Sequence, residues 1–232
     1  MTLVSDPTAA PRPPRSVLAT IYAFPPNRET MGGTAYLICA QDQAGQPANL
    51  LVDTPAWHPE TADFIQAQGG VRWWVITHRN GMGRVAPFQD RLQCELVVQE
   101  QEAYLLPEID GRLTYHQQLD LEDIATVLWT PGYSPGSACL YYKAHGGVLF
   151  TGRHLLPSKA GQMTALRFSK TFHWPRQLRQ IQRLQQDFTA ETLAYFCPAA
   201  NLGFLRGKTA VANAYEQLQA IDVETLRLCQ PF

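Results

Sequence analysis

The residues most able to do chemistry stand where apolar stretches of the chain end. "WWVITH" delivers Thr77 and His78 to a glycine-rich turn, "LLVDTP" contains Asp53, and "VLFTGRHLL" contains Arg153. A buried strand that stops at a histidine and opens into a loop is a common way to present a metal ligand. These stretches therefore raise the question of a metal centre at one edge of a sheet.

The positions that follow His78 supply few ligands for such a centre. They offer only Arg79, Asn80, Met82 and Arg84 among glycines. A thioether and an amide oxygen are poor ligands for zinc, and catalytic zinc sites use about three protein ligands and a water. The stretch predicts the shell of a metal site and not a working one.

Other catalytic signatures are weak. Ser134 and Ser137 lie in the turn "TPGYSPGS", but no Ser-His-Asp order is evident around them. "GFLRGK" lacks the spacing of a phosphate-binding loop. Five cysteines stand far apart without a CxxC pair, which argues against a zinc ribbon and against a disulfide framework.

Length and composition favour a buried globular protein. The chain has 232 residues, 45% hydrophobic and 17% charged, with a formal net charge of -1. This balance leaves no overall electrostatic footprint for nucleic acid, although a local basic patch is still compatible with it. No stretch approaches the roughly 20 apolar residues of a membrane span, and the first residues lack a signal-peptide core. We expect a soluble, cytoplasmic protein.

The pattern of elements predicts an α/β or α+β fold. We expect a flexible, proline-rich tail over residues 1–15 and a single domain over 16–232. Expected strands cover 16–24, 34–42, 49–55, 72–78, 94–99 and three stretches between 126 and 156, the last two joined at "AHGG". Expected helices cover 58–70, 100–110, 176–188 and 209–221, and 191–198 is a strand or a helix end.

The order of the turns is more telling than the strands. "LLVDTP", "ITH", "TPGYSPGS", "LYY" and "VLFTGRHLL" follow one another at sensible spacing, so that residues 33 to 205 resemble the metallo-β-lactamase superfamily. The resemblance implies a four-layer αββα sandwich of two mixed sheets, with a metal site on loops at one edge. "AFPPNRETMGGTAYLI", "EQEAYLLP", "GRHLLP" and "KTFHWPRQLR" also resemble an uncharacterised subgroup of such proteins in photosynthetic lineages.

The same resemblance implies that most metal ligands are lost. Of the seven ligand positions only the first, His78, keeps its histidine. The other six hold Asn80, Met82, Gly83, Tyr133, Arg153 and, before Asn201, Ala200. We therefore expect no cofactor, and zinc in particular to be absent.

Replacement of an acidic ligand by Arg153 puts a fork of donors near the former metal position. The arginine could pair internally with Asp53, or it could make an electropositive pocket for a small anionic ligand or an acidic side chain of a partner. Tyr133 either fills the vacated volume or acts as an acid or base. The pocket is expected to contain Asp53, His78, Asn80, Met82, Tyr133, Arg153 and Asn201, with Arg79, His154, His173, Trp174, Arg206 and Lys208 at its rim.

The leading interpretation is a pseudoenzyme that acts by binding or assembly, with a protein partner or a small anion as its ligand and with no nucleic acid. The alternative is a hydrolase with a rebuilt metal site, or a metal-independent one that uses His78, Tyr133 and Arg153. RNA processing, by analogy with nucleases of the superfamily, is disfavoured by the charge balance. Fold alone licenses none of these functions.

Overall fold

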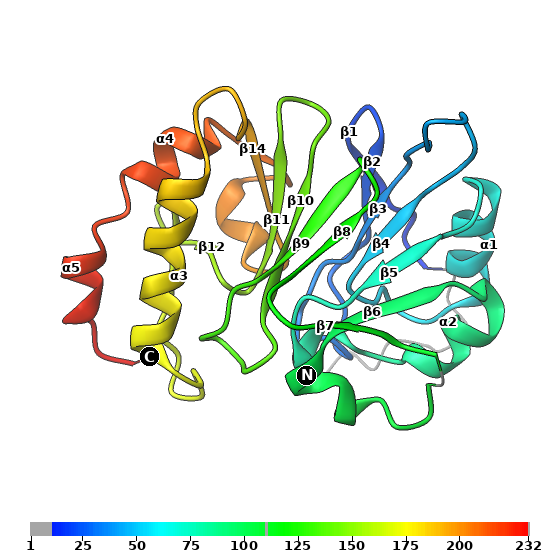
Figure 1. Ribbon diagram of the computed structural model, residues 1–232, viewed down its shortest axis with the longest axis horizontal. Helices are drawn as coiled ribbons and strands as arrows, with labels where there is room; N and C mark the ends of the chain where they lie inside the picture. The colour runs from blue at the N-terminus through cyan, green and yellow to red at the C-terminus, as the bar shows by residue number, and fades with distance from the viewer. Residues whose placement is uncertain (1–10, 110, 232) are drawn as a thin grey trace, which may run out of the picture.

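Two β-sheets stacked face to face organise the chain in this computed structural model, which describes residues 11–109 and 111–231 (Figure 1). The first sheet has the strand order of the sequence. It runs antiparallel as far as its fourth strand and parallel from there on. Its strands are β1 (Arg15–Leu18), β2 (Ile21–Ala23), β3 (Tyr36–Ile38), β4 (Leu50–Val52), β5 (Trp73–Val75), β6 (Glu95–Gln99) and β7 (Leu113–Tyr115).

The second sheet has the order β15-β14-β11-β10-β9-β8, and only β11 and β14 pair in parallel. A two-stranded ribbon of β12 and β13 lies outside both sheets. These strands are β8 (Gln118–Leu121), β9 (Ala125–Trp129), β10 (Ala138–Tyr142), β11 (Val148–Gly152), β12 (Leu156–Pro157), β13 (Met163–Thr164), β14 (Tyr195–Pro198) and β15 (Val211–Ala212).

Helices cover the outer face of each sheet. In Figure 1, α1 (Pro59–Ala67) and α2 (Val85–Leu92) flank the first sheet, while α3 (Trp174–Asp187), α4 (Ala214–Gln219) and α5 (Val223–Arg227) flank the second. Short 3₁₀ helices are η1 (Arg79–Gly81), η2 (Glu100–Leu105) and η3 (Leu202–Leu205). The layers are therefore helix, sheet, sheet and helix, and the expected αββα sandwich of two mixed sheets is confirmed.

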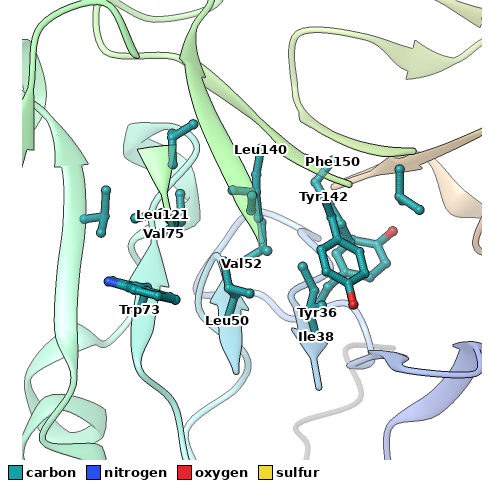
Figure 2. Close-up of a cluster of buried hydrophobic side chains, with 14 of the residues drawn as sticks. Tyr36, Ile38, Leu50, Val52, Trp73, Val75, Leu121, Leu140, Tyr142 and Phe150 are labelled. Carbon is teal, nitrogen blue, oxygen red and sulfur yellow. The ribbon is translucent and has the colours of Figure 1, made fainter. Parts of the chain in front are cut away.

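The main core lies between the sheets. Figure 2 shows Tyr36, Val52 and Trp73 of the first sheet facing Tyr142 and Phe150 of the second. The rings of Tyr36 and Phe150 meet edge to face at 5.2 Å between centroids. The Tyr36 hydroxyl donates to the carbonyl of Pro198 at 2.7 Å, so that the one buried polar group of this pair is satisfied.

Two helices begin at caps that the sequence supplies. The Nδ1 atom of His58 accepts the amide N–H of Glu60 before α1, and His173 does the same for Arg176 before α3. A proline occupies the first turn of each helix, where its missing N–H costs nothing. Helix α3 buries Leu178, Ile181 and Leu184, the face that the sequence predicts.

Several elements differ from the prediction. The stretch expected as one strand over 16–24 folds back on itself as β1 and β2, which begin at Arg15 and end at Ala23. Residues 1–10 of the expected tail lie outside the described residues. Helices α2 and α5 and strands β7, β8, β12, β13 and β15 were not anticipated, and residues 100–105 form a 3₁₀ helix. No helix within the described ranges is long and apolar enough to cross a bilayer.

Candidate functional site at the former metal edge

Asp53 follows β4 directly and is the floor of the site. Its backbone is left-handed (φ 56), and its carboxylate accepts the amide N–H of Thr77 at 2.8 Å and the Thr77 hydroxyl at 2.8–2.9 Å. A Cβ on Gly81 would stand 2.3 Å from Oδ1 of Asp53, so only glycine fits there. Burial raises the pKa of Asp53 to about 6, against the opposing effects of the Thr77 hydrogen bonds and of the Arg153 charge.

His78 follows β5 and is buried, with 1% of its surface exposed. Neither ring nitrogen has a hydrogen-bond partner among the described residues. Burial, helped by the positive charge of Arg153, lowers the pKa of His78 to about 3. Its ring lies 5.4 Å from that of Tyr133. At neutral pH His78 is thus an uncharged imidazole with free bonding capacity.

Arg153 follows β11 and spans from the interior to the surface. Its Nη2 atom donates to the carbonyl of Thr30 at 3.2 Å and to that of Met31 at 2.8 Å, whereas its Nε is buried without a partner among the described residues. Its guanidinium carbon lies 5.9 Å from the centroid of the Tyr133 ring. Within the described ranges no ion pair joins Arg153 to Asp53. The predicted internal pair is therefore not formed, because Thr77 already satisfies the carboxylate.

The loop over residues 27–33 closes the site from outside, and we call it the lid loop. The side chain of Asn27 accepts the amide N–H of Thr30 at 3.0 Å, and Asn27 and Gly33 bridge the two ends of the loop. At its tip Met31 is left-handed (φ 54) and 62% exposed. Arg153 therefore joins the end of β11 to a preorganised loop about 120 residues away in the sequence.

Asn80 and Tyr133 complete the closure. The Tyr133 hydroxyl donates to Oδ1 of Asn80 at 2.8 Å, and Nδ2 of Asn80 lies 3.1 Å from the sulfur of Met31. Burial raises the pKa of Tyr133, and the Arg153 charge opposes that rise. These two side chains are locked to each other and to the lid loop. The proton of the Tyr133 hydroxyl is donated to Asn80.

A second charged pair lies beside this group. Nε of Arg79 donates to Oε1 of Glu102 at 2.9 Å, and Glu102 is 1% exposed while its Oε2 has no partner among the described residues. A Cβ on Gly136 would approach Glu102 to 2.8 Å, so the loop that contains Tyr133 packs directly on this carboxylate. Glu102 could not be singled out from the sequence, because "EQEAYLLP" shows the pattern of a short helix and no sign of a buried carboxylate.

Some expected pocket residues lie elsewhere. Met82 packs in the apolar cluster beneath α1 and α2, since the chain turns into α2 at that point, and the sulfur that reaches the site belongs to Met31. Asn201 donates to the carbonyl of Pro157. Lys208 lines a separate groove of about 470 Å³ with Arg12 and residues 13–15, and Arg206 ends η3.

The other predicted rim residues serve packing. His154 turns into the interior below α3, where burial lowers its pKa to about 3, and Nε2 of Gln177 donates to its carbonyl. Trp174 is buried, and its indole N–H donates to the carbonyl of Leu226 beside α5. His173 caps α3, and its amide N–H donates to the carbonyl of Gly132.

The residues around His78 do not fit a di-metal centre. Asn80 and Tyr133 are engaged with each other, Met82 is in the core and Arg153 brings a cation. Nowhere in residues 11–109 and 111–231 do three His, Cys, Asp or Glu side chains gather closely enough to hold a metal ion. The unpartnered nitrogens of His78 could accept one metal bond, but one imidazole beside a guanidinium is too weak a donor set.

Sequence comparison gives little for this chain: no protein-family model matches it, and no curated protein matches it. Structural comparison gives clear neighbours. The BLEG-1 B3 metallo-β-lactamase is 18% identical, with a TM-score of 0.58 over 78% of this chain and 91% of its own. An archaeal metallo-β-lactamase superfamily protein, ST1585 from Sulfolobus tokodaii, is 12% identical, with a TM-score of 0.55 over 89% and 84%.

A third neighbour, TTHA1623, was solved in a di-iron-bound form. It is 19% identical, with a TM-score of 0.54 over 77% of this chain and 94% of its own. At these identities the likeness shows the fold, which is the metallo-β-lactamase fold predicted from the order of the turns. The resemblance to the superfamily implies a metal site at one edge of the sheets. In this chain the polar side chains described above occupy that edge beneath the lid loop.

Proposed function

We propose that this chain is a catalytically degenerate protein of the metallo-β-lactamase fold, without a di-metal centre, that acts by binding a partner or a small anion. One observation carries the proposal: Arg153 stands at a former ligand position and is bonded to the lid loop at Thr30 and Met31. A permanent cation there repels a divalent ion at close range. Its planar donors suit a carboxylate or a phosphate.

In this proposal the electropositive site is a shallow surface at Arg153 and not an enclosed pocket. His78 and Asp53 are shut off from solvent, whereas Arg153 is partly exposed at the edge of the lid loop. Five cavities of about 340–630 Å³ lie elsewhere on the described surface, and none is lined by these three residues. An anion would therefore dock against the outer edge of the guanidinium.

The alternative, a metal-independent hydrolase that uses His78, Tyr133 and Arg153, has less support. A general base needs a nucleophile or water within hydrogen-bond reach. His78 has no partner among the described residues, and the hydroxyl of Tyr133 is committed to Asn80. A pKa near 3 also makes His78 a weak base at neutral pH.

Anion-dependent thermal unfolding tests the binding proposal. Sodium phosphate and sodium succinate, added at constant ionic strength, are expected to raise the melting temperature more than sodium chloride does. Arg153→Met should abolish that difference, while Lys159→Met, which removes an exposed cation in the following loop, should keep it. Equal shifts in all three proteins would contradict an Arg153 site. Turnover of a β-lactam or ester that is lost in His78→Ala would contradict the loss of catalysis.

A further inference from the structure

Charge is distributed unevenly along the chain, and the near-zero total hides this. Between Asp123 and Asp187 there is no Asp or Glu, yet that segment contains eight Lys and Arg. Residues 1–123 hold 15 Asp and Glu against 8 Lys and Arg. The segment from β9 to α3 is therefore basic, while most carboxylates belong to the half that builds the first sheet.

Cations of this segment alternate with aromatic side chains in "RFSKTFHWPR", residues 167–176. Phe172 is 51% exposed and Lys170 is exposed. The guanidinium of Arg176 lies 5.2 Å from the ring centroid of Trp129 on β9, which places a cation over an aromatic ring. We call the surface made by Trp129, Arg167, Phe168, Lys170, Phe172 and Arg176 the basic aromatic face.

This face adjoins the former metal edge. The amide N–H of Phe172 donates to the carbonyl of Tyr133 at 3.1 Å, and the rings of Phe168 and Tyr133 meet edge to face at 6.3 Å. Tyr133 in turn lies beside Arg153. The guanidinium of Arg153 is thus a further cation at one end of the same surface.

Three cations of the face form no ion pair with the carboxylates that the structure describes. In the part of the chain that the structure describes, no carboxylate oxygen lies within 4.0 Å of the charged nitrogens of Arg167, Lys170 or Arg176. A groove of about 390 Å³ lies beside Arg167 and is lined by Phe168, Phe172 and residues 173–175 among others. Its walls combine aromatic rings with the polar side chains of Ser169, Thr171 and His173, and Arg167 places a positive charge at its border.

We propose that the basic aromatic face binds a short acidic peptide segment of a partner protein, with an apolar anchor residue seated in the groove among flanking carboxylates. The inference rests on the proposed binding function and names its partner chemistry. Complementary charge steers such a segment, and an aromatic-walled groove fits one side chain. A long polyanion such as single-stranded RNA suits the protein less, because the acid-rich half would repel the strand beyond the face.

A synthetic peptide of Asp and Glu with a central Phe, labelled with fluorescein, is the probe, and anisotropy in low-salt buffer is the readout. Lys170→Glu and Phe172→Ala should each weaken binding at least about fivefold. Lys170 is a charge at the rim of the interface, and Phe172 is an apolar contact that loses its water on binding. Lys143→Glu is the matched control. It makes the same charge change within the basic segment, but it lies in the hairpin between β10 and β11, at the opposite end of β11 from Arg153, and should leave binding within about twofold.

Three results would overturn the inference. The first is absence of binding by the wild-type chain. The second is an equal loss in Lys143→Glu, which would indicate general charge attraction. The third is competition by oligo-dT or by phosphatidylserine vesicles that bind more tightly than the peptide, which would assign the face to nucleic acid or lipid. The phosphate-dependent melting shift of the same preparations reports on Arg153 separately, so failure of one proposal is distinguishable from failure of the other.

Discussion

Arg153→Met removes the guanidinium and keeps most of the side-chain stem. In the wild type one nitrogen of this group, Nη2, holds the carbonyls of Thr30 and Met31 and so joins β11 to the lid loop. The substitution leaves both carbonyls to be solvated by water. We therefore expect a loss of stability that is concentrated at the lid loop.

The magnitude follows from the contacts. A hydrogen bond from a charged donor contributes about 1.5–3 kcal/mol, and because a single nitrogen serves both carbonyls we count one such contribution. The substitution also removes the buried Nε donor that has no partner, which offsets the loss of stability by about 1 kcal/mol. The net loss is about 0.5–2 kcal/mol, which lowers the melting temperature of a chain of this size by roughly 1–8 °C.

Urea unfolding of the wild type, Arg153→Met, Asp53→Asn and the double variant measures this loss and locates it. Since Thr77 and not Arg153 satisfies the carboxylate of Asp53, the coupling free energy between the two substitutions should stay below about 1 kcal/mol. Hydrogen exchange of amides 27–33 should accelerate in Arg153→Met. A coupling above about 2 kcal/mol, with unchanged exchange in the lid loop, would refute the reasoning and favour an internal ion pair.

Three further substitutions test the closed site. His78→Leu should leave stability at pH 7 within about 1 kcal/mol of wild type, because it removes a buried group without partners. Since the pKa of His78 is about 3 when folded and 6.5 in its ordinary state, the wild type gains stability as pH rises from 3 to 6.5. This gain in the free energy of unfolding amounts to about 1.4 kcal/mol per pH unit, and it should be absent in His78→Leu. Urea unfolding of both proteins at pH 5 and pH 7 measures the difference. Arg79→Met should cost about 2–3 kcal/mol by stranding the buried carboxylate of Glu102, and adding Glu102→Gln should recover part of it; a further loss in the double variant would argue against the pair. Gly132→Ala, whose Cβ would lie 2.3 Å from Cβ of Gln177, should lower stability by more than about 3 kcal/mol in thermal unfolding, and a wild-type melting curve would contradict the packing of that loop on α3.

The fold could be predicted from turns more than from strands. Asp53, His78 and Arg153 each follow a strand end, as the order of motifs predicts, and the strands that deliver them are β4, β5 and β11. Helix α2 was missed because "VAPFQDRL" contains Pro87, which reads as a break although a proline in the first turn is tolerated. Strands of two or three residues such as β7 and β12 give too short a pattern to recognise.

The contacts that close the site could not be predicted. The partners of Arg153 are backbone carbonyls about 120 residues earlier in the chain. Every residue has a backbone carbonyl, so the residue types do not indicate which carbonyl accepts the bond. Pairing Arg153 with Asp53 was the natural expectation from charge alone. It failed because the hydroxyl and amide of Thr77, two residues beyond the end of β5, already donate hydrogen bonds to the carboxylate. Likewise Met82 and Met31 are chemically equivalent, and only the turn into α2 decides which sulfur reaches the site.

The central claim is that the side chains at this edge cannot hold a metal pair, and zinc binding measures it most directly. Protein purified without added metal is dialysed against excess zinc and then against buffer, and its metal content is determined by mass spectrometry beside His78→Ala. We predict far less than one zinc, iron or manganese per chain, with no difference between the two proteins. One or two ions retained per chain by the wild type and lost in His78→Ala would contradict the account.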